Sequence, residues 1–222
     1  MPLLTTAHHH DVAAFVLAGG RSSRMGTDKA MLALDGRTLL DRALDLARTV
    51  SDDVRVVGPA ARFPASLRAV EDMFPDRGPL GGIHAALAAS TKELNLVLAV
   101  DCPFIAPELL PFLVAEARRW RAMVTLPRSI AESGGRRRES ELAGPGAGSV
   151  GTVLHPLCAI YRRGFAPFAE RALRVGRNKI EPLLGEVATR VITPEELAEH
   201  GFSPEMFRNL NTPADLERAR RL

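Results

Sequence analysis

Short apolar runs alternate along the chain with longer stretches in which apolar residues recur every three or four positions. Residues 12–18 and 94–100 are almost wholly apolar, which is typical of strands buried on both faces of a sheet. Between them the pattern predicts a helix from a cap at Thr38 to about residue 50, with one apolar stripe made of Leu39, Leu40, Ala43, Leu44 and Ala47. The alternation predicts an α/β fold with a mostly parallel sheet and helices on both faces.

The remaining elements follow the same two periodicities. Further strands are expected at residues 54–57, 69–70, 122–126, 155–161 and 189–192. Further helices are expected at residues 79–90, 107–121, 167–174, 181–184 and 194–200, and from Pro213 onward. Residues 128–152 are rich in glycine, serine and charge without apolar periodicity, so they are expected to form a flexible loop, as are the first ten residues, which include His8, His9 and His10.

Composition indicates a globular protein and argues against nucleic-acid and membrane partners. At 222 residues the chain suits one domain, and 46% apolar with 25% charged residues is ordinary for a globular protein. The net charge of +3 suits an anionic small molecule, and with one Trp and one Tyr to stack on bases a nucleic-acid partner is not expected. No signal peptide or membrane-spanning run is evident, so a cytoplasmic location without a membrane partner is expected, and Cys102 and Cys158 should be reduced buried thiols.

A loop rich in glycine and positive charge follows the first strand. Gly19 and Gly20 let backbone N–H groups approach a ligand, and Arg21, Arg24 and Lys29 follow within ten residues. This combination at a strand end suits a polyphosphate. It is neither a Walker loop, whose lysine follows a glycine, nor the dinucleotide fingerprint, whose glycines alternate. The alternative is a glycine-rich turn with solvated basic residues.

A second loop, residues 72–83, reads DMFPDRGPLGGI and leads into a helix that Pro79 opens. Gly81 and Gly82 fall in the first turn of this helix, where each costs about 1 kcal/mol of helix propensity relative to alanine. That cost indicates a close approach at these positions. Either a neighbouring element packs tightly there, or a base or phosphate lies over the positive end of the helix, and we favour the latter.

Asp101 arrives where the apolar strand 94–100 ends, and Cys102-Pro103 then stops the strand. The next helix is expected to begin too far along the chain for Asp101 to cap it. A carboxylate at the end of a buried strand, beside a predicted phosphate loop, is well placed to hold Mg²⁺.

Two asparagines lie near the C-terminus in the segment FRNLNTPADL. Asn209 and Asn211 are two apart, so in an extended segment they point the same way while Leu210 faces the core. Thr212 is accounted for as the cap of the last helix. The asparagines are either turn formers or ligands of a bound molecule.

The run LAGGRSSRMGTDK resembles the signature of nucleotidyltransferases that couple a nucleoside triphosphate to a phosphorylated acceptor. Among these it most resembles the molybdenum cofactor guanylyltransferases, and the segments GPLGG, VDCPF and NLNTP extend the resemblance over almost the whole chain. The family transfers GMP from GTP to the terminal phosphate of molybdopterin, using magnesium, and releases pyrophosphate with molybdopterin guanine dinucleotide. The resemblance thus implies a single nucleotidyltransferase domain over residues 1–222, with a three-layer, Rossmann-like sheet.

Residue roles come with the resemblance. Catalytic roles fall on Lys29, Asp101, Arg21 and Arg24, with Lys29 on the α-phosphate, the arginines on the β- and γ-oxygens, and Asp101 as the metal ligand. The implied acceptor ligands are Asn209 and Asn211. The implied nucleotide-binding residues are Leu17, Ala18, Gly19, Gly20, Lys29, Asp72, Gly78, Pro79, Leu80 and Asp101.

One position departs from the family pattern. Gly58-Pro59 stands where the family often has an asparagine that helps to recognise guanine, so base recognition would rest more on backbone groups of residues 17–19 and 78–80. The alternatives are therefore a CTP-dependent or sugar-phosphate nucleotidyltransferase of the same fold, and a catalytically silent nucleotide-binding subunit. Beyond GTP and molybdopterin as substrates, the resemblance suggests transient contact with proteins that deliver the cofactor.

Overall fold

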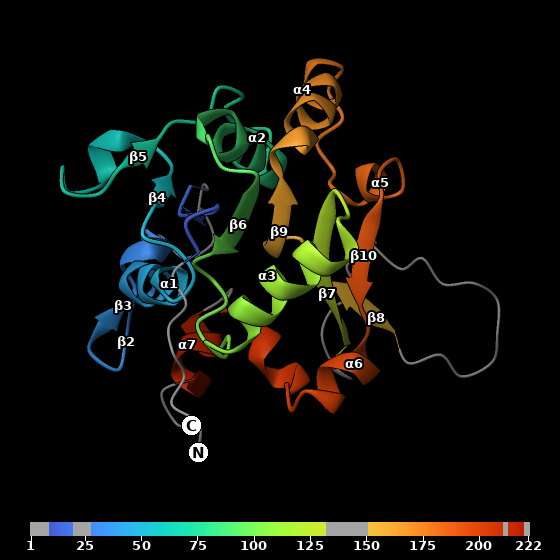
Figure 1. The fold of residues 1–222 in the computed structure, drawn as a ribbon. Helices are drawn as coiled ribbons and strands as arrows, with labels where there is room; N and C mark the ends of the chain where they lie inside the picture. Colours follow the sequence, from blue (N-terminus) through green and yellow to red (C-terminus); the bar gives the residue numbers. More distant parts are fainter. Residues whose placement is uncertain (1–8, 20–27, 132–150, 211–212, 220–222) are drawn as a thin grey trace.

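The computed structural model describes residues 9–19, 28–131, 151–210 and 213–219 (Figure 1). Its strands are β1 (Val12–Leu17), β2 (Ala33–Leu34), β3 (Arg37–Thr38), β4 (Val54–Val57), β5 (Ala69–Val70), β6 (Leu94–Ala99), β7 (Val124–Ile130), β8 (Thr152–Leu154), β9 (Cys158–Arg162) and β10 (Thr189–Ile192). Its α-helices are α1 (Leu39–Arg48), α2 (Pro79–Ala89), α3 (Leu109–Trp120), α4 (Ala166–Arg174), α5 (Glu181–Leu184), α6 (Pro194–Glu199) and α7 (Pro213–Ala219). Short 3-10 turns are η1 (Lys29–Met31), η2 (Ala60–Arg62), η3 (Arg163–Phe165) and η4 (Pro204–Phe207).

One sheet organises the described chain, in the order β10-β7-β9-β6-β1-β4-β5, with β8 paired to β7. The pairs β1–β4, β1–β6, β4–β5 and β7–β10 are parallel, which confirms the predicted mostly parallel α/β fold. The exception to parallel pairing along this order is β9, which runs antiparallel between β6 and β7. Strand β8 already runs antiparallel to β7, and the chain continues into β9 in the same direction after a short turn in which the Cys158 N–H donates to the His155 carbonyl, with no helical crossover between them.

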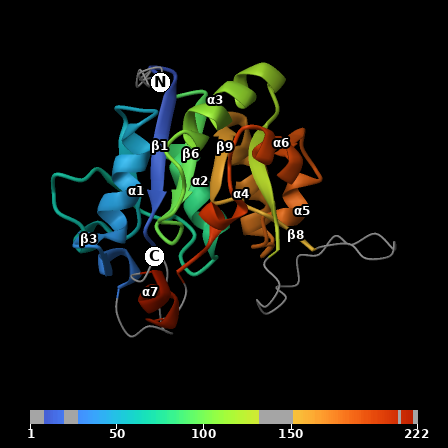
Figure 2. The same ribbon diagram turned by 90° about the horizontal axis from the view of Figure 1, so that it is seen from below.

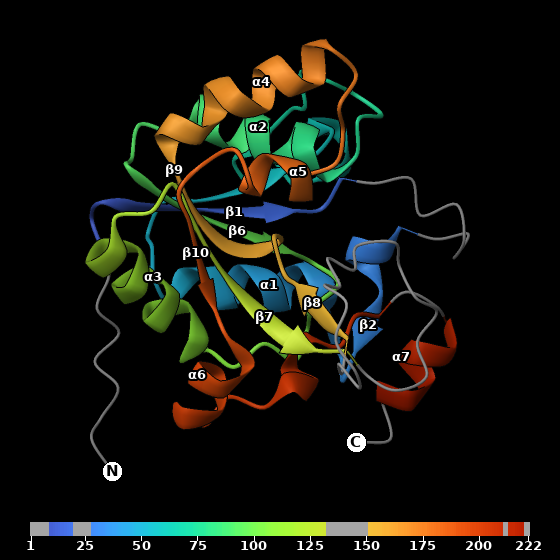
Figure 3. The same cartoon turned by 90° about the vertical axis from the view of Figure 1, so that its right-hand side faces the viewer.

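Helices cover both faces of the sheet and enclose two hydrophobic cores. Figure 3 shows α2, α4 and α5 on one side of the sheet, and α1, α3 and α6 on the other. Successive residues of β1 serve the two cores alternately: Ala14 and Val16 pack with α1 and α3, while Ala13 and Phe15 pack with α2 and α4. Burial on both faces explains why β1 reads as a continuous apolar run.

Several element boundaries differ from the sequence prediction. Helix α3 begins at Leu109 rather than at residue 107, because residues 106–108 form a turn in which the Leu109 N–H donates to the Ala106 carbonyl. The predicted strand at 122–126 starts and ends later, and the predicted loop at 128–152 gives up residues at both ends to the antiparallel pair β7–β8. Residues 132–150 of that loop, like residues 1–8 of the N-terminus, lie outside the described chain.

The caps and turns predicted from neighbouring residues agree better with the structure. The Thr38 hydroxyl accepts from the Asp41 N–H at 3.0 Å and caps α1, and Pro79 occupies the first turn of α2, as predicted. Asp35 and Gly36, with φ of 51° and 76°, form the turn between β2 and β3. No helix in the described residues is both long and apolar enough to cross a membrane.

The parallel strands end at one edge of the sheet, and this edge carries the candidate site. Strands β1, β4 and β6 are mutually parallel neighbours, so their carboxyl ends lie together. Figure 2 shows α7 beyond the carboxyl end of β1, at the same edge. The fold therefore gathers the segments after Leu17, Val57 and Ala99 at a place that the C-terminal helix also reaches.

Candidate active site

Two residues predicted to be catalytic, Lys29 and Asp101, lie next to each other. Lys29 opens η1, and Asp101 follows β6. The Lys29 ammonium donates to Asp101 Oδ2 at 3.2 Å, with side chains that are 18% and 24% exposed. The two residues are 72 positions apart in the sequence, so only the fold brings the predicted phosphate ligand to the predicted metal ligand.

The turn that presents Lys29 is fastened by its neighbour, Asp28. Asp28 Oδ1 accepts from the Ala30 N–H at 3.1 Å and caps η1. Asp28 Oδ2 accepts from Arg62 Nε at 3.1 Å and pairs with Arg62 Nη2 at 2.5 Å. Arg62 comes from η2, which follows β4, so this ion pair joins the end of the glycine-rich segment to the end of the neighbouring strand.

Asn209, a predicted acceptor ligand, lies beside the segment of Asp101 and Cys102. The Leu210 N–H donates to the Asp101 carbonyl at 3.0 Å, and the Cys102 thiol donates to Asn209 Oδ1 at 2.9 Å. Burial, reinforced by the negative charge of Asp101, raises the pKa of the Cys102 thiol well above its usual range, which keeps the proton on sulfur for this bond. Leu210 is buried, as predicted, and Cys102 and Cys158 are both free and buried.

The ends of β1 and β4 approach closely at two glycines. The Ala18 N–H donates to the Val57 carbonyl at 3.1 Å, and a Cβ on Gly58 would lie 3.3 Å from the Gly19 nitrogen and 3.2 Å from the Phe63 ring. Gly58 also has a φ of 155°, which residues with side chains rarely adopt. A side chain at position 58 would therefore be strained in this chain.

Asp72 lies against the first turn of α2, so close to Gly81 that a side chain there would clash with it. Its Oδ1 accepts from the Phe74 N–H at 2.8 Å, and burial raises the pKa of its carboxyl group above the usual value. A Cβ on Gly81 would lie 2.5 Å from Asp72 Oδ2 and 3.0 Å from the Phe74 carbonyl oxygen, while one on Gly82 would meet Leu17 at 3.3 Å. The close approach inferred from both glycines is thus made by protein atoms, which is the packing alternative. The predicted contacts of Asp72 and of Gly78, Pro79 and Leu80 with a nucleotide remain predictions.

A polar pair made of the buried Ser129 and the half-buried His155 extends the site edge toward β7 and β8. His155 Nε2 and Ser129 Oγ lie 2.7 Å apart, and the His155 ring stacks on Phe207 with centroids 4.1 Å apart. Burial lowers the pKa of His155 to about 4, so the ring is neutral at physiological pH. Phe207 is two positions before Asn209, so this pair supports the segment that carries the predicted acceptor ligand.

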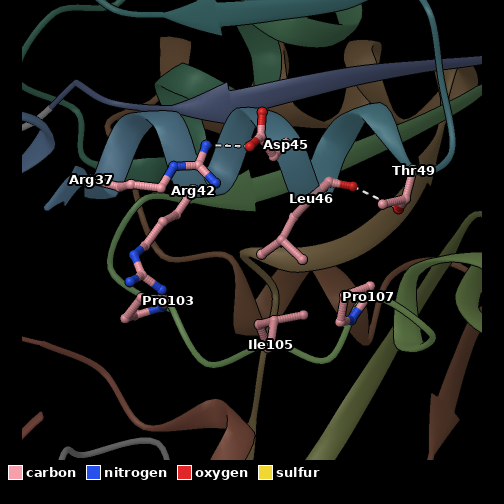
Figure 4. A pocket seen from close by; sticks show the side chains of 8 residues that line it. All are labelled: Arg37, Arg42, Asp45, Leu46, Thr49, Pro103, Ile105 and Pro107. Atoms are coloured by element: carbon pink, nitrogen blue, oxygen red, sulfur yellow. Dashed lines mark hydrogen bonds and ion pairs between the residues drawn. The ribbon is translucent and has the colours of Figure 1, made fainter. Parts of the chain in front are cut away.

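A surface groove beside α1 is separate from this cluster. Figure 4 shows its lining, with Arg37 pointing toward Asp45; the full set is Arg37, Arg42, Asp45, Leu46, Thr49, Pro103, Ile105 and Pro107. Arg37 is paired with Asp45, and Arg42 pairs with Asp35 at 2.8 Å and donates to the Leu34 carbonyl. The arginines of the groove are therefore engaged by protein groups, and the groove lacks Lys29 and Asp101.

Some of the predicted site lies outside the described residues. This applies to Gly20, Arg21, Arg24 and Asn211, and also to the predicted cap Thr212. Sequence reasoning missed Asp28, Arg62 and Cys102 as parts of the site. Asp28 carried a usable signal, since an aspartate directly before a short turn is a common cap, but nothing in the sequence pairs it with Arg62.

Together the described groups form a site in which the ion pair of Lys29 and Asp101 has an amide beside it, and a second ion pair, of Asp28 and Arg62, holds the turn that carries Lys29. Among the described residues there is no cluster of three or more side chains that would by themselves hold a metal ion. Asp101 offers oxygen ligands at a partly exposed position, which suits Mg²⁺ when substrate phosphates and water complete its coordination.

Comparisons with known proteins identify the family. Residues 14–190 match the model of the MobA-like NTP transferase domain. The chain is 31% identical over 207 residues to a probable molybdenum cofactor guanylyltransferase from Pelotomaculum thermopropionicum, covering 92% of this chain and 90% of the relative. It is 30% identical over 213 residues to the molybdenum cofactor guanylyltransferase of Desulfosudis oleivorans, covering 94% of each.

Solved structures that are similar to this chain include nucleotidyltransferases of the same fold. The molybdopterin-guanine dinucleotide biosynthesis protein A of Archaeoglobus fulgidus is similar with a TM-score of 0.73 at 25% identity, over 94% of this chain and 97% of that one. The 2-C-methyl-D-erythritol 4-phosphate cytidylyltransferase of Thermus thermophilus shares the fold, with a TM-score of 0.68 at 22% identity, over 95% of this chain and 98% of that one. The chain belongs to the family of MobA-like NTP transferase domains and is a nucleotidyltransferase.

Proposed function

We propose that the protein transfers GMP from GTP to the terminal phosphate of molybdopterin, with Mg²⁺, and releases pyrophosphate and molybdopterin guanine dinucleotide. The names of its relatives support this substrate pair. The observation that carries the proposal is the contact between Lys29 and Asp101, with Asn209 joined to the same strand end through Cys102. A cation, a metal ligand and a predicted acceptor ligand then share one site.

The reaction follows from the charges involved. An oxygen of the acceptor phosphate forms a bond to the α-phosphorus of GTP, and the bond from that phosphorus to the bridging oxygen of the β-phosphate breaks. The electron pair leaves with pyrophosphate. A phosphate monoester has a second pKa near 6, so the attacking oxygen is already ionised at pH 7 and no general base is needed. Catalysis then depends on position and on stabilising the negative charge that develops.

The chain's own residues supply these two requirements. Lys29 is assigned to the α-phosphate, and its ammonium group stabilises the extra charge on the non-bridging oxygens. Arg21 and Arg24, predicted from the sequence, are assigned to the β- and γ-phosphates. Asp101 would hold Mg²⁺, which when bound neutralises phosphate charge and aligns the leaving group.

Recognition of the base would rest on backbone groups. The Ala18 N–H is engaged by Val57, and the Leu17 carbonyl accepts from the Val100 N–H at 3.3 Å. Contacts to guanine from this segment are therefore assigned to the Ala18 carbonyl and to Gly19. Gly78 and Pro79 are exposed at the start of α2, where the positive helix end favours an anionic or electron-rich group.

Calorimetry with GTP, CTP and ATP, each with Mg²⁺, tests the nucleotide. Binding is expected to favour GTP. A preference for CTP would contradict the guanylyltransferase proposal and assign the protein to the related cytidylyl transfer. Failure to bind any nucleotide would refute nucleotide transfer altogether and support a non-catalytic role.

Two substitutions test the chemistry. Lys29→Met and Asp101→Asn are each expected to lower kcat for molybdopterin guanylylation by at least about 100-fold, because each removes charge that the transition state needs. Lys92→Met and Asp52→Asn are matched controls, since these residues precede β6 and β4 at the opposite edge of the sheet. Near-normal kcat in Lys29→Met or Asp101→Asn would refute the assignment.

A further inference from the structure

Arg62, in the 3-10 turn η2, forms an ion pair with Asp28, the residue before Lys29. Its side chain is 31% exposed and directs Nε and Nη2 onto one oxygen of Asp28, whose side chain is 28% exposed. The next residue, Phe63, is buried against Gly58, so η2 is anchored to the end of β4. The pair joins two segments that are 34 positions apart in the sequence.

The two carboxylate oxygens of Asp28 accept hydrogen bonds from different segments. Oδ2 takes the Arg62 guanidinium, while Oδ1 caps the turn that begins with Lys29. The other end of that turn is anchored by Ala30, which is buried, and by the Leu32 N–H, which donates to the Lys29 carbonyl at 3.2 Å. The orientation of Asp28 therefore fixes the turn from which the Lys29 side chain reaches Asp101.

Asp28 also places a negative charge one residue from Lys29. An unpaired carboxylate there would compete with incoming phosphate for the Lys29 ammonium and would repel the phosphate itself. Arg62 neutralises this charge and holds it on the side facing η2. A charge-assisted bond with two donors from one guanidinium gives the pair a fixed geometry that a lysine would not provide.

We propose that Arg62 is a positioning residue, which through Asp28 sets the turn that carries Lys29 and keeps that lysine directed at Asp101 and the incoming phosphate. The part of this inference that concerns turnover rests on the proposed function. The part that concerns the placement of Lys29 does not, because the contact with Asp101 is a property of the protein alone.

The placement is tested first without substrate, by the ¹H–¹⁵N resonance of the Lys29 ammonium group, assigned by its absence in Lys29→Met. Arg62→Gln and Asp28→Asn are expected to shift or broaden this resonance, while melting temperature shows whether each variant is folded. Asparagine still caps a helix, so Asp28→Asn removes the ion pair and keeps the cap, and it serves if Arg62→Gln does not fold. Arg68→Gln is the matched control, since Arg68 pairs with Asp53 and precedes β5 at the opposite edge. An unchanged resonance in the folded variants would overturn the proposal.

Turnover separates positioning from direct contact with substrate. Arg62→Gln is expected to lower kcat by about 10- to 100-fold, as small misplacements of catalytic groups do. In the Lys29→Met background the same change should alter kcat by no more than about twofold, within the scatter of independent sites. An equal loss in both backgrounds would place Arg62 on the substrate and overturn the positioning role. An inactive wild-type protein would refute the proposed function, while the Lys29 resonance would still decide the role of Arg62.

Discussion

Replacement of Gly81 by alanine is expected to destabilise the protein, although alanine is the better helix former. Helix propensity alone would favour Gly81→Ala by about 1 kcal/mol. The added Cβ, however, would lie 2.5 Å from Asp72 Oδ2 and 3.0 Å from the backbone oxygen of Phe74. Asp72 must then turn away and lose the bond that it accepts from the Phe74 N–H, which costs about 1.5–3 kcal/mol for a charged acceptor.

The backbone contact adds to this cost. Overpacking of this kind costs about 1–3 kcal/mol, so the net loss in the free energy of unfolding is expected to be about 1.5–5 kcal/mol after the helix gain is subtracted. For a chain of this size each kcal/mol corresponds to about 2–4 °C in melting temperature. Urea unfolding followed by circular dichroism measures the difference directly.

Two companion variants identify the cause. Gly185→Ala makes the same chemical change at a position with φ of −77°, where a Cβ would meet the Pro182 carbonyl oxygen at an ordinary 3.5 Å. It is expected to be neutral or to stabilise by up to about 1 kcal/mol. In an Asp72→Ala background, Gly81→Ala should cost less than in the wild type. If Gly81→Ala is as stable as the wild type, or if its cost is the same without Asp72, the close approach of that carboxylate is not what requires glycine.

Two further outcomes concern stability. Gly58→Ala is expected to lower the free energy of unfolding by about 1–3 kcal/mol, because residue 58 has a φ of 155° and the added Cβ would press on the Phe63 ring. Gly36→Ala is the control, since φ is 76° there and no other part of the protein lies within 4 Å of an added Cβ. A loss at Gly58 no larger than the loss at Gly36 would show that the contacts at Gly58 do not contribute. The burial of His155 holds its pKa at about 4, below the 6.5 of an exposed histidine, so the unfolded chain binds more protons below pH 6.5 and stability is expected to fall between about pH 6.5 and 4. The loss is at most about 3 kcal/mol, and it should be smaller in His155→Gln; equal pH dependence of urea unfolding in the two proteins would contradict this cause.

The amino-acid sequence was sufficient for those features that depend on near neighbours. Strand β1 was predicted because burial on both faces requires an unbroken apolar run, and the helix beginning after Thr38 because its cap and its apolar stripe lie within a few turns. Lys29 and Asp101 were identified as site residues because one lies in a glycine-rich basic loop and the other ends a buried strand, and the resemblance to a known family gave both a role. In the structure their side chains are in contact, while their roles stay predictions.

Other features depend on which segments meet across the sheet. No local pattern distinguishes an antiparallel β9 from a parallel strand when both are equally apolar, and only its pairing with β6 and β7 settles its direction. The same limit applied to the glycines of α2, whose spacing signalled a close approach without saying whether a ligand or Asp72 makes it. Neighbours in sequence constrain backbone conformation, but the partner of a side chain is chosen by packing.

The candidate site shows the difference between what local sequence indicates and what the tertiary structure decides. Local chemistry marked Lys29 for phosphate and Asp101 for a metal, since charge type and strand position suffice for that. The tertiary structure alone joined Asp28 to Arg62 and Cys102 to Asn209, pairs separated by 34 and 107 residues. Such pairs form because the carboxyl ends of neighbouring parallel strands converge at one edge, where the segment after η4 also packs, and this convergence is a property of the assembled fold that no single segment encodes.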